Sequence, residues 1–216
     1  MVDLPLSDIL VYLLTGARWT LLLSAIAFLG GGIGALLLLL LRYGRPRLGA
    51  RFLHLYVELF QGTPLLLQLF LVFFGLPLIG IDVPPLAAAG LALTFYASAF
   101  LSEIWRGCID AIPRGQWDAS GALGLNFLTQ MRDVILPQAL RIAVPPTVGF
   151  LTQLVKATAL ASIVGFVELT KSGQIVSNAT FQPLLIYGIV ALIYFAMCYP
   201  LTFCARILER KLGQSR

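Results

Sequence analysis

Five apolar stretches, each long enough to cross a lipid bilayer, constrain this chain more than any other feature. A membrane-spanning helix needs roughly 20 mostly apolar residues, and the stretches lie at about 19–41, 52–76, 85–104, 142–164 and 184–207. The sequence is 59% hydrophobic and 12% charged, whereas a soluble domain carries about 25% charged residues. We therefore predict an all-α integral membrane protein with five transmembrane helices, forming one domain over residues 1–216.

Basic residues are distributed unevenly between the two sides of these helices. One side carries Arg18 and Lys171. The loop after the first stretch, the loop after the third and the C-terminal tail carry Arg42, Arg45, Arg47, Arg51, Arg106, Arg114, Arg132, Arg141, Arg206, Arg210, Lys211 and Arg216. Because cytoplasmic loops of membrane proteins are rich in Lys and Arg, the N-terminus is predicted outside and the C-terminus in the cytoplasm. The net charge of +5 thus indicates cytoplasmic loops and not a nucleic-acid partner.

Small residues and prolines inside the stretches make further predictions. A patch of glycines in the first stretch predicts close helix packing and not a phosphate loop, which needs a preceding strand and an aqueous setting. Prolines in the second and fourth stretches are expected to kink or break those helices. The glycines are Gly30, Gly31, Gly32 and Gly34, and the prolines are Pro64, Pro145 and Pro146.

The loop at about 110–137 is the longest segment outside the apolar stretches, and its pattern predicts two short helices. Asp118 is expected in the first turn of one helix, where an acid suits the helix dipole. Ala119, Ala122 and Leu123 give that helix a small apolar face, and Gly124 is placed to end it in a left-handed conformation. A second helix is expected from Phe127 until Pro137. The pattern leaves two alternatives: docking into a partner's groove, or lying on lipid headgroups.

Residue spacing in this loop resembles a known family. The loop resembles the EAA loop of bacterial ABC importer permeases. The pattern that carries this resemblance is Asp118-Ala119-Ser120, three residues, Gly124, nine residues and then Val134-x-Leu136-Pro137. Asp replaces Glu, Ser replaces the second Ala and Val replaces Ile. Four longer segments resemble the polar amino-acid (histidine/glutamine-type) uptake permeases: 61–77, 102–119, 135–146 and 154–170.

The resemblance implies a type I ABC importer permease of the bacterial inner membrane, made of a single permease domain. Two such permease subunits, identical or different, would work with a cytoplasmic ATPase dimer, an external amino-acid-binding protein and membrane lipid. The residues expected to couple to the ATPase are Gln116, Asp118, Ala119, Ser120, Leu123, Gly124 and Leu125. The chain has no G-x-x-x-x-G-K-[ST] motif, so ATP and magnesium are expected in the partner, and no cofactor or metal is expected here.

Polar residues inside the apolar stretches are candidates for a substrate path, because such residues usually face a wet cavity or other protein. The candidates are Gln61, Thr63, Glu103, Gln153, Lys156 and Thr158. Glu58, Gln61 and Gln68 would share one face of a continuous helix. Glu103 and Lys156 supply opposite charges for a zwitterion, but Glu103 could instead neutralise Lys156 or lie beside Arg106.

Two other polar residues receive a different interpretation. Glu58 is assigned a structural role, and His54 an interfacial one. The family often has Arg where this chain has Gln61, and an acid where it has Ala157. These two departures leave open which amino acid this region recognises.

Two other classes of function are weighed against an importer. A membrane enzyme could use Glu103, Asp110 or His54, but no catalytic cluster or metal-ligand spacing supports it. An ATP-independent channel is the other alternative. The chain is therefore predicted to be a transporter subunit and not an enzyme.

Overall fold

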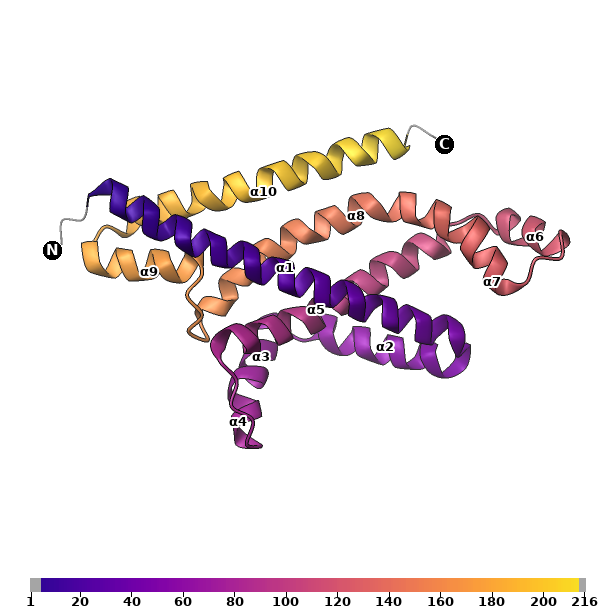
Figure 1. Cartoon of the computed structure of the whole chain (residues 1–216), viewed down its shortest axis with the longest axis horizontal. Helices are drawn as coiled ribbons and strands as arrows, with labels where there is room; N and C mark the ends of the chain where they lie inside the picture. Colours follow the sequence, from indigo (N-terminus) through magenta and orange to yellow (C-terminus); the bar gives the residue numbers. More distant parts are fainter. Residues whose placement is uncertain (1–4, 214–216) are drawn as a thin grey trace.

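The computed structural model describes residues 5–213, and within that range the chain forms helices and no strands (Figure 1). Four helical segments are long and apolar enough to cross a membrane. They are α1 (Leu6–Gly44), α5 (Pro85–Asp110), α10 (Pro183–Gly213) and a composite helix over 127–162, which joins α7 (Phe127–Thr129), η2 (Gln130–Ile135), α8 (Leu136–Ala157) and η3 (Thr158–Ser162). The all-α membrane class is confirmed. Arg216, one of the basic tail residues, lies outside the described residues.

The remaining predicted span is a bent pair of helical segments. Helix α2 (Pro46–Gly62) is followed by α3 (Leu65–Phe70), η1 (Leu71–Gly75) and α4 (Leu76–Leu78), with a bend of 99° between the two parts. Pro64 has no backbone N–H to continue the helix, and the residue before a proline avoids helical backbone angles. Thr63 is extended accordingly. The break expected at Pro64 is confirmed, and the total is five when this bent pair is counted as one span.

Gln68 stabilises this bend and does not lie on a common face with Glu58 and Gln61. Its side chain is buried and its Nε2 lies 2.8 Å from the carbonyl oxygen of Phe60, which α2 leaves unpaired, and 2.9 Å from Oγ1 of Thr63. A helix end in lipid needs such partners because no water is present to replace them. The predicted alignment of Gln68 was wrong because it assumed an unbroken helix.

The breaks expected at the other prolines are not found. Helix α8 runs through Pro145 and Pro146 without interruption. The hydroxyl of Thr147 donates to the carbonyl of Ala143 at 2.7 Å and accepts from the indole N–H of Trp105 at 3.0 Å. Such local polar contacts allow prolines within a membrane helix.

Pro137 does not end the preceding helix either. The segment before it is a π-helix, in which the N–H of Leu136 bonds the carbonyl of Met131 five residues earlier. This wider turn accommodates the proline ring, which would clash with the carbonyl four residues before it in a regular α-helix. The second helix of the loop therefore continues directly into the fourth span.

The glycine patch forms a close contact between α1 and α5, as predicted. An added Cβ at Gly31 would lie 2.5 Å from the Cβ of Ala97, and one at Gly34 would lie 2.8 Å from the Cβ of Ser98. Side chains at these positions would push the two helices apart. Gly32 is not part of the contact, since its nearest neighbour is a ring atom of Trp105 at 3.7 Å.

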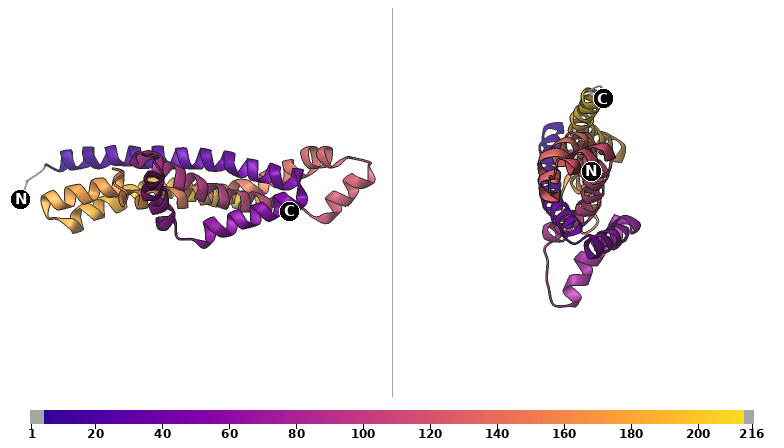
Figure 2. Two further views of the ribbon diagram at one scale, coloured as in Figure 1. Left: turned by 90° about the horizontal axis from the view of Figure 1, so that it is seen from below. Right: turned by 90° about the vertical axis from the view of Figure 1, so that its right-hand side faces the viewer.

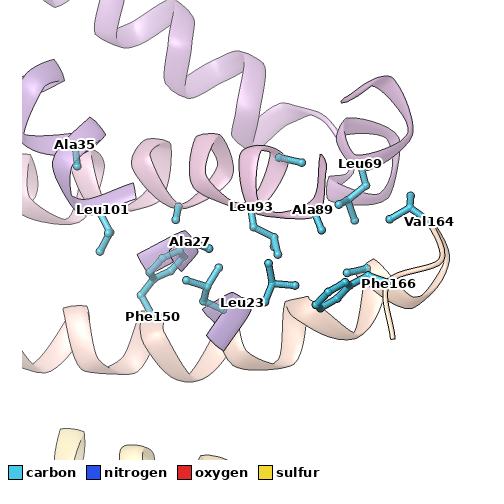
Figure 3. Packing of buried hydrophobic residues seen from close by; sticks show 14 residues of the cluster. Leu23, Ala27, Ala35, Leu69, Ala89, Leu93, Leu101, Phe150, Val164 and Phe166 are labelled. Atoms are coloured by element: carbon cyan, nitrogen blue, oxygen red, sulfur yellow. The ribbon is translucent and has the colours of Figure 1, made fainter. Parts of the chain in front are cut away.

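The main core lies between α1, α3, α5 and α8 (Figure 3). Leu23 and Ala27 of α1 pack in one buried cluster with Leu93 of α5 and Phe150 of α8. A turn at Gly165 then leads into α9 (Leu169–Thr180), a short helix that packs against α1 and α10.

The molecule is elongated, with different elements at its two ends (Figures 1 and 2). Helix α6 (Arg114–Ala122) and α7 lie at one end, near the turn between α1 and α2, and the start of α1 lies at the other. Helix α1 has 39 residues, or about 58 Å of helix, against a hydrocarbon layer of about 30 Å. Its ends therefore extend beyond the bilayer.

Candidate functional site

Helix α6 is a short, well-terminated helix at the tip of the molecule. Pro113 precedes it, and Gly124 ends it at φ +74°. The N–H of Leu125 bonds the carbonyl of Ser120, and the N–H of Gly124 bonds that of Gly121 at 2.9 Å. This pair of bonds is a Schellman motif, which needs a left-handed residue. The prediction that Gly124 ends this helix in a left-handed conformation is confirmed. Asp118, in contrast, lies in the second turn and not the first, because the helix starts at Arg114.

One side of α6 is open to solvent. Leu123 is 80% exposed and Leu128, just beyond, is 77% exposed. The exposed residues among those expected to couple to the ATPase are Gln116, Asp118, Ala119, Leu123 and Gly124. Ser120 is buried and donates to the carbonyl of Trp117 at 2.9 Å, and Leu125 is half-buried. Ser120 and Leu125 therefore support the exposed face and do not form it.

A compact apolar cluster joins α6 to the membrane-spanning helices. Ile109 and Ile112 at the end of α5 pack with Met131 and Ile135 of the π-helix, and Trp117 of α6 packs against them. The Nε2 of Gln138 donates to the Oε1 of Gln116 across the same junction at 3.4 Å. Through this cluster, α6 packs against residues at the end of α5 and in the composite helix.

Glu103 belongs to an ion-pair network near the end of α5. Its carboxylate contacts the guanidinium of Arg106, with one oxygen 3.0 Å from Nε, and Arg106 also contacts Asp110. The ion pair that Glu103 forms is thus with Arg106, and not with Lys156 as in one of the two structural alternatives. The spacing of three and four residues along one helix face favours these pairs.

A pocket of about 430 Å³ opens beside this network. It is lined by Arg42, Leu53, His54, Val57, Glu58, Gln61, Glu103 and Arg106. Gln61 and Glu103, both predicted for the substrate path, are thus brought to one site. Thr63 lies at the adjacent bend, exposed, with its hydroxyl donating to Leu59 at 2.7 Å.

The three candidates near the end of the composite helix separate into two groups. Gln153 and Lys156 are exposed on one face of α8. No ion pair involves Lys156 among residues 5–211, whose side chains the structure describes. Thr158 is fully buried, and its hydroxyl donates to the carbonyl of Val155 at 2.8 Å. A side chain without exposed surface cannot contact a substrate in this conformation.

Glu168 is a buried acid that the reasoning from sequence did not single out. It is fully buried and caps the N-terminus of α9, where Oε2 accepts from the N–H of Thr170 and Oε1 from that of Lys171, both at 2.9 Å. Oε2 also accepts from the hydroxyls of Tyr194 at 2.8 Å and Thr20 at 3.3 Å. Burial raises the pKa of this carboxyl, and the four hydrogen bonds oppose the shift. The signal available in sequence was an acid in an apolar run just before a helix start.

Comparison with known proteins identifies the family. Residues 27–214 match the family described as "Binding-protein-dependent transport system inner membrane component". The chain belongs to this family of ABC importer permeases. The probable amino-acid ABC transporter permease protein YckA of Bacillus subtilis is 35% identical to it over 200 residues, 93% of this chain and 88% of that protein. The probable glutamine ABC transporter permease protein GlnP of the same organism is 37% identical over 205 residues, 93% of each chain.

A solved structure gives the same result for the fold. The "Crystal structure of an amino acid ABC transporter with histidines" is 31% identical to this permease, with a TM-score of 0.90 over 98% of this chain and 100% of that one. The type I importer fold expected from the EAA-like loop is confirmed. These relatives are transporter subunits, so the permease is not an enzyme and ATP hydrolysis belongs to a partner ATPase. The comparisons give no support to a membrane enzyme or an ATP-independent channel.

Proposed function

We propose that this permease carries an amino acid into the bacterial cytoplasm, driven by ATP that a partner ATPase dimer binds with magnesium and hydrolyses. Two permease subunits enclose the path, and an external binding protein delivers the amino acid. The relatives' names support the amino-acid class. The observation that carries the proposal is the solvent-exposed face of α6, which packs through Trp117 on a cluster shared by two spans.

Docking into a protein groove accounts for this face better than contact with lipid headgroups. A headgroup helix needs a broad apolar face, whereas Leu123 is the one large apolar side chain exposed within 114–124. The rest of the face is small or polar: Gln116, Asp118 and Ala119. Such a surface fits a shallow groove with polar edges. ATP binding closes the ATPase dimer and moves α6, which turns the substrate cavity outward, and hydrolysis reverses the motion.

The distribution of arginines supports a cytoplasmic position for α6 and for the C-terminus, with the N-terminus outside. Arg42, Arg45 and Arg47 lie in the turn between α1 and α2, at the same end of the molecule as α6 (Figure 1). Basic residues gathered at that end satisfy the positive-inside rule. The surrounding lipid is that of the bacterial inner membrane.

Gln61, Thr63, Glu103, Gln153 and Lys156 remain as substrate-path residues in this proposal. A lysine that faces lipid deep in a span raises the free energy of membrane insertion by about 2.5–3.5 kcal/mol on insertion scales. Water in a substrate path, or the second permease subunit, removes that cost for Lys156. Pairing around a two-fold axis brings both copies of α8 to one cavity.

Reconstitution of the complete transporter tests the proposal. The permease is purified with its ATPase partner in lipid, and ATP hydrolysis is measured with the binding protein and each of the common amino acids. We expect one amino acid or a small group of related ones to stimulate hydrolysis and to accumulate in vesicles only with ATP. Uptake that continues without ATP, or hydrolysis that no amino acid stimulates, would contradict the proposal.

A further inference from the structure

Helix α2 has three distinct faces, and one of them is unexpected for a membrane helix. Its first face is buried against α1 and α5 and includes Leu53. The second is exposed and apolar, as expected for lipid contact, with Leu48, Phe52, Leu55 and Leu59 each at least half exposed. The third is exposed and polar. It consists of Arg47, Arg51, His54, Glu58 and Gln61, which we call the polar stripe.

The polar stripe is continuous along the helix. At 3.6 residues per turn its five residues fall within an arc of about 80° and extend about 21 Å along the axis. Nε2 of His54 lies 3.1 Å from Oε1 of Glu58, with both side chains more than half exposed. The stripe runs from the turn after α1 to the bend at Pro64. Lipid does not solvate such a surface, so water or another polar surface must cover it.

The stripe borders the 430 Å³ pocket through His54, Glu58 and Gln61. Two further elements supply the other charged walls: Arg42 from α1, and Glu103 with Arg106 from α5. The pocket therefore presents both signs of charge, and its volume is in the range that holds small molecules. A zwitterionic amino acid has the complementary pair of charges.

The groups in this pocket are not equally available to a ligand. Arg106 is already bonded to Glu103 and Asp110. Arg42 forms no ion pair within the described part of the chain, and Glu58 has His54 as its ion-pair partner there. A free guanidinium binds a carboxylate through two parallel hydrogen bonds, and a carboxylate accepts hydrogen bonds from an ammonium group.

We propose that the polar stripe and this pocket form the cytoplasmic half of the substrate path, where the pocket holds the amino acid before release, its carboxylate at Arg42 and its ammonium group at Glu58. The inference deepens the proposed import function and rests on it. Arg51 and Arg47 continue the stripe from the pocket to the cytoplasmic surface. His54 and Glu58, assigned interfacial and structural roles from sequence, become path residues because α2 turns them away from both the core and the lipid face.

The two exposed faces of α2 give a matched test on one helix. In a variant of the assembled transporter with Cys108, Cys198 and Cys204 replaced by Ala, single cysteines are placed at His54, Glu58 and Gln61, and for comparison at Phe52, Leu55 and Leu59. A charged methanethiosulfonate reagent is added from the cytoplasmic side. We expect cysteines on the polar stripe to react about tenfold faster or more, because lipid excludes a charged reagent. The transported amino acid should slow the reaction at position 61, which lines the pocket without supplying either of the two charged contacts. Equal rates on both faces, or no protection, would overturn the assignment.

Transport kinetics provide a second readout that a structural role would not reproduce. Arg42→Gln and Glu58→Gln should each raise the KM for uptake at least about tenfold, since each removes one charged contact worth about one decade of affinity. Asp82→Asn, an exposed acid outside the pocket, should leave KM unchanged. If KM is unchanged in both pocket variants and the transporter imports amino acids normally, the pocket does not bind the substrate. The proposed import function then still stands. A wild-type complex that imports no amino acid contradicts the proposed function first.

Discussion

Gly124→Asp should abolish amino-acid uptake while the permease still inserts into the membrane. Gly124 adopts φ +74° and is exposed beside Leu123, so the change places a charged side chain on the face proposed to dock. An unpaired charge buried at an interface costs about 2–5 kcal/mol, enough to reduce uptake below about 5% of the wild-type rate. Uptake of labelled amino acid into vesicles, with the amount of inserted permease measured in parallel, checks the result.

Gly124→Asn is the matched control. Asn has nearly the same size as Asp and tolerates the left-handed conformation, but it carries no charge. It should keep most of the uptake. If the Asn variant is as inactive as the Asp variant, strain or bulk at this turn explains the loss. If the Asp variant transports normally, α6 does not couple to the ATPase.

Glu168→Ala should destabilise the permease more than any other loss of a single acid. The carboxylate joins three elements, since it caps α9 and bonds Thr20 of α1 and Tyr194 of α10. Its removal leaves two backbone N–H groups and two hydroxyls in a buried site without that acceptor, and each unsatisfied group costs about 1–3 kcal/mol. A total loss of about 3 kcal/mol lowers the Tm by about 6–12 °C. Thermal unfolding of the purified complex in lipid measures it.

Two further variants separate the cap from general charge effects. Glu168→Gln keeps one acceptor oxygen and nearly the same volume, so its Tm should fall by less than that of Glu168→Ala. Asp82→Ala removes an exposed acid and should change the Tm little. An unchanged Tm in Glu168→Ala would show that the buried hydrogen bonds do not hold α1, α9 and α10 together.

Hydropathy and local spacing determined much of the architecture in advance. The apolar stretches could be located because a bilayer demands about 20 apolar residues per span. The end of α6 could be predicted because glycine adopts the left-handed conformation there more readily than other residues. The Glu103–Arg106 pair could also be read from the sequence, since residues three apart share a helix face.

Features that depend on distant contacts could not be read in this way. The bend after α2 is held by Gln68, whose role depends on where the chain folds back after Pro64. Helix α8 continues through Pro145 and Pro146 although local rules favour a break, since Thr147 and Trp105 supply polar contacts there. The path role inferred for Glu58 depends on which face of α2 the neighbouring helices cover, and periodicity alone does not specify that.

The most direct test of the central claim is a photo-crosslink from the exposed face of α6. A photoreactive amino acid is placed at Leu123 in the assembled transporter, and as a control at Leu184, which is 91% exposed in the first turn of α10. Helix α10 begins beside α9, at the end of the molecule opposite to α6 (Figure 1). We expect a crosslink from position 123 to the ATPase subunit, changed in yield by ATP, and none from position 184. Crosslinks from position 123 to lipid alone, or to the external binding protein, would contradict it.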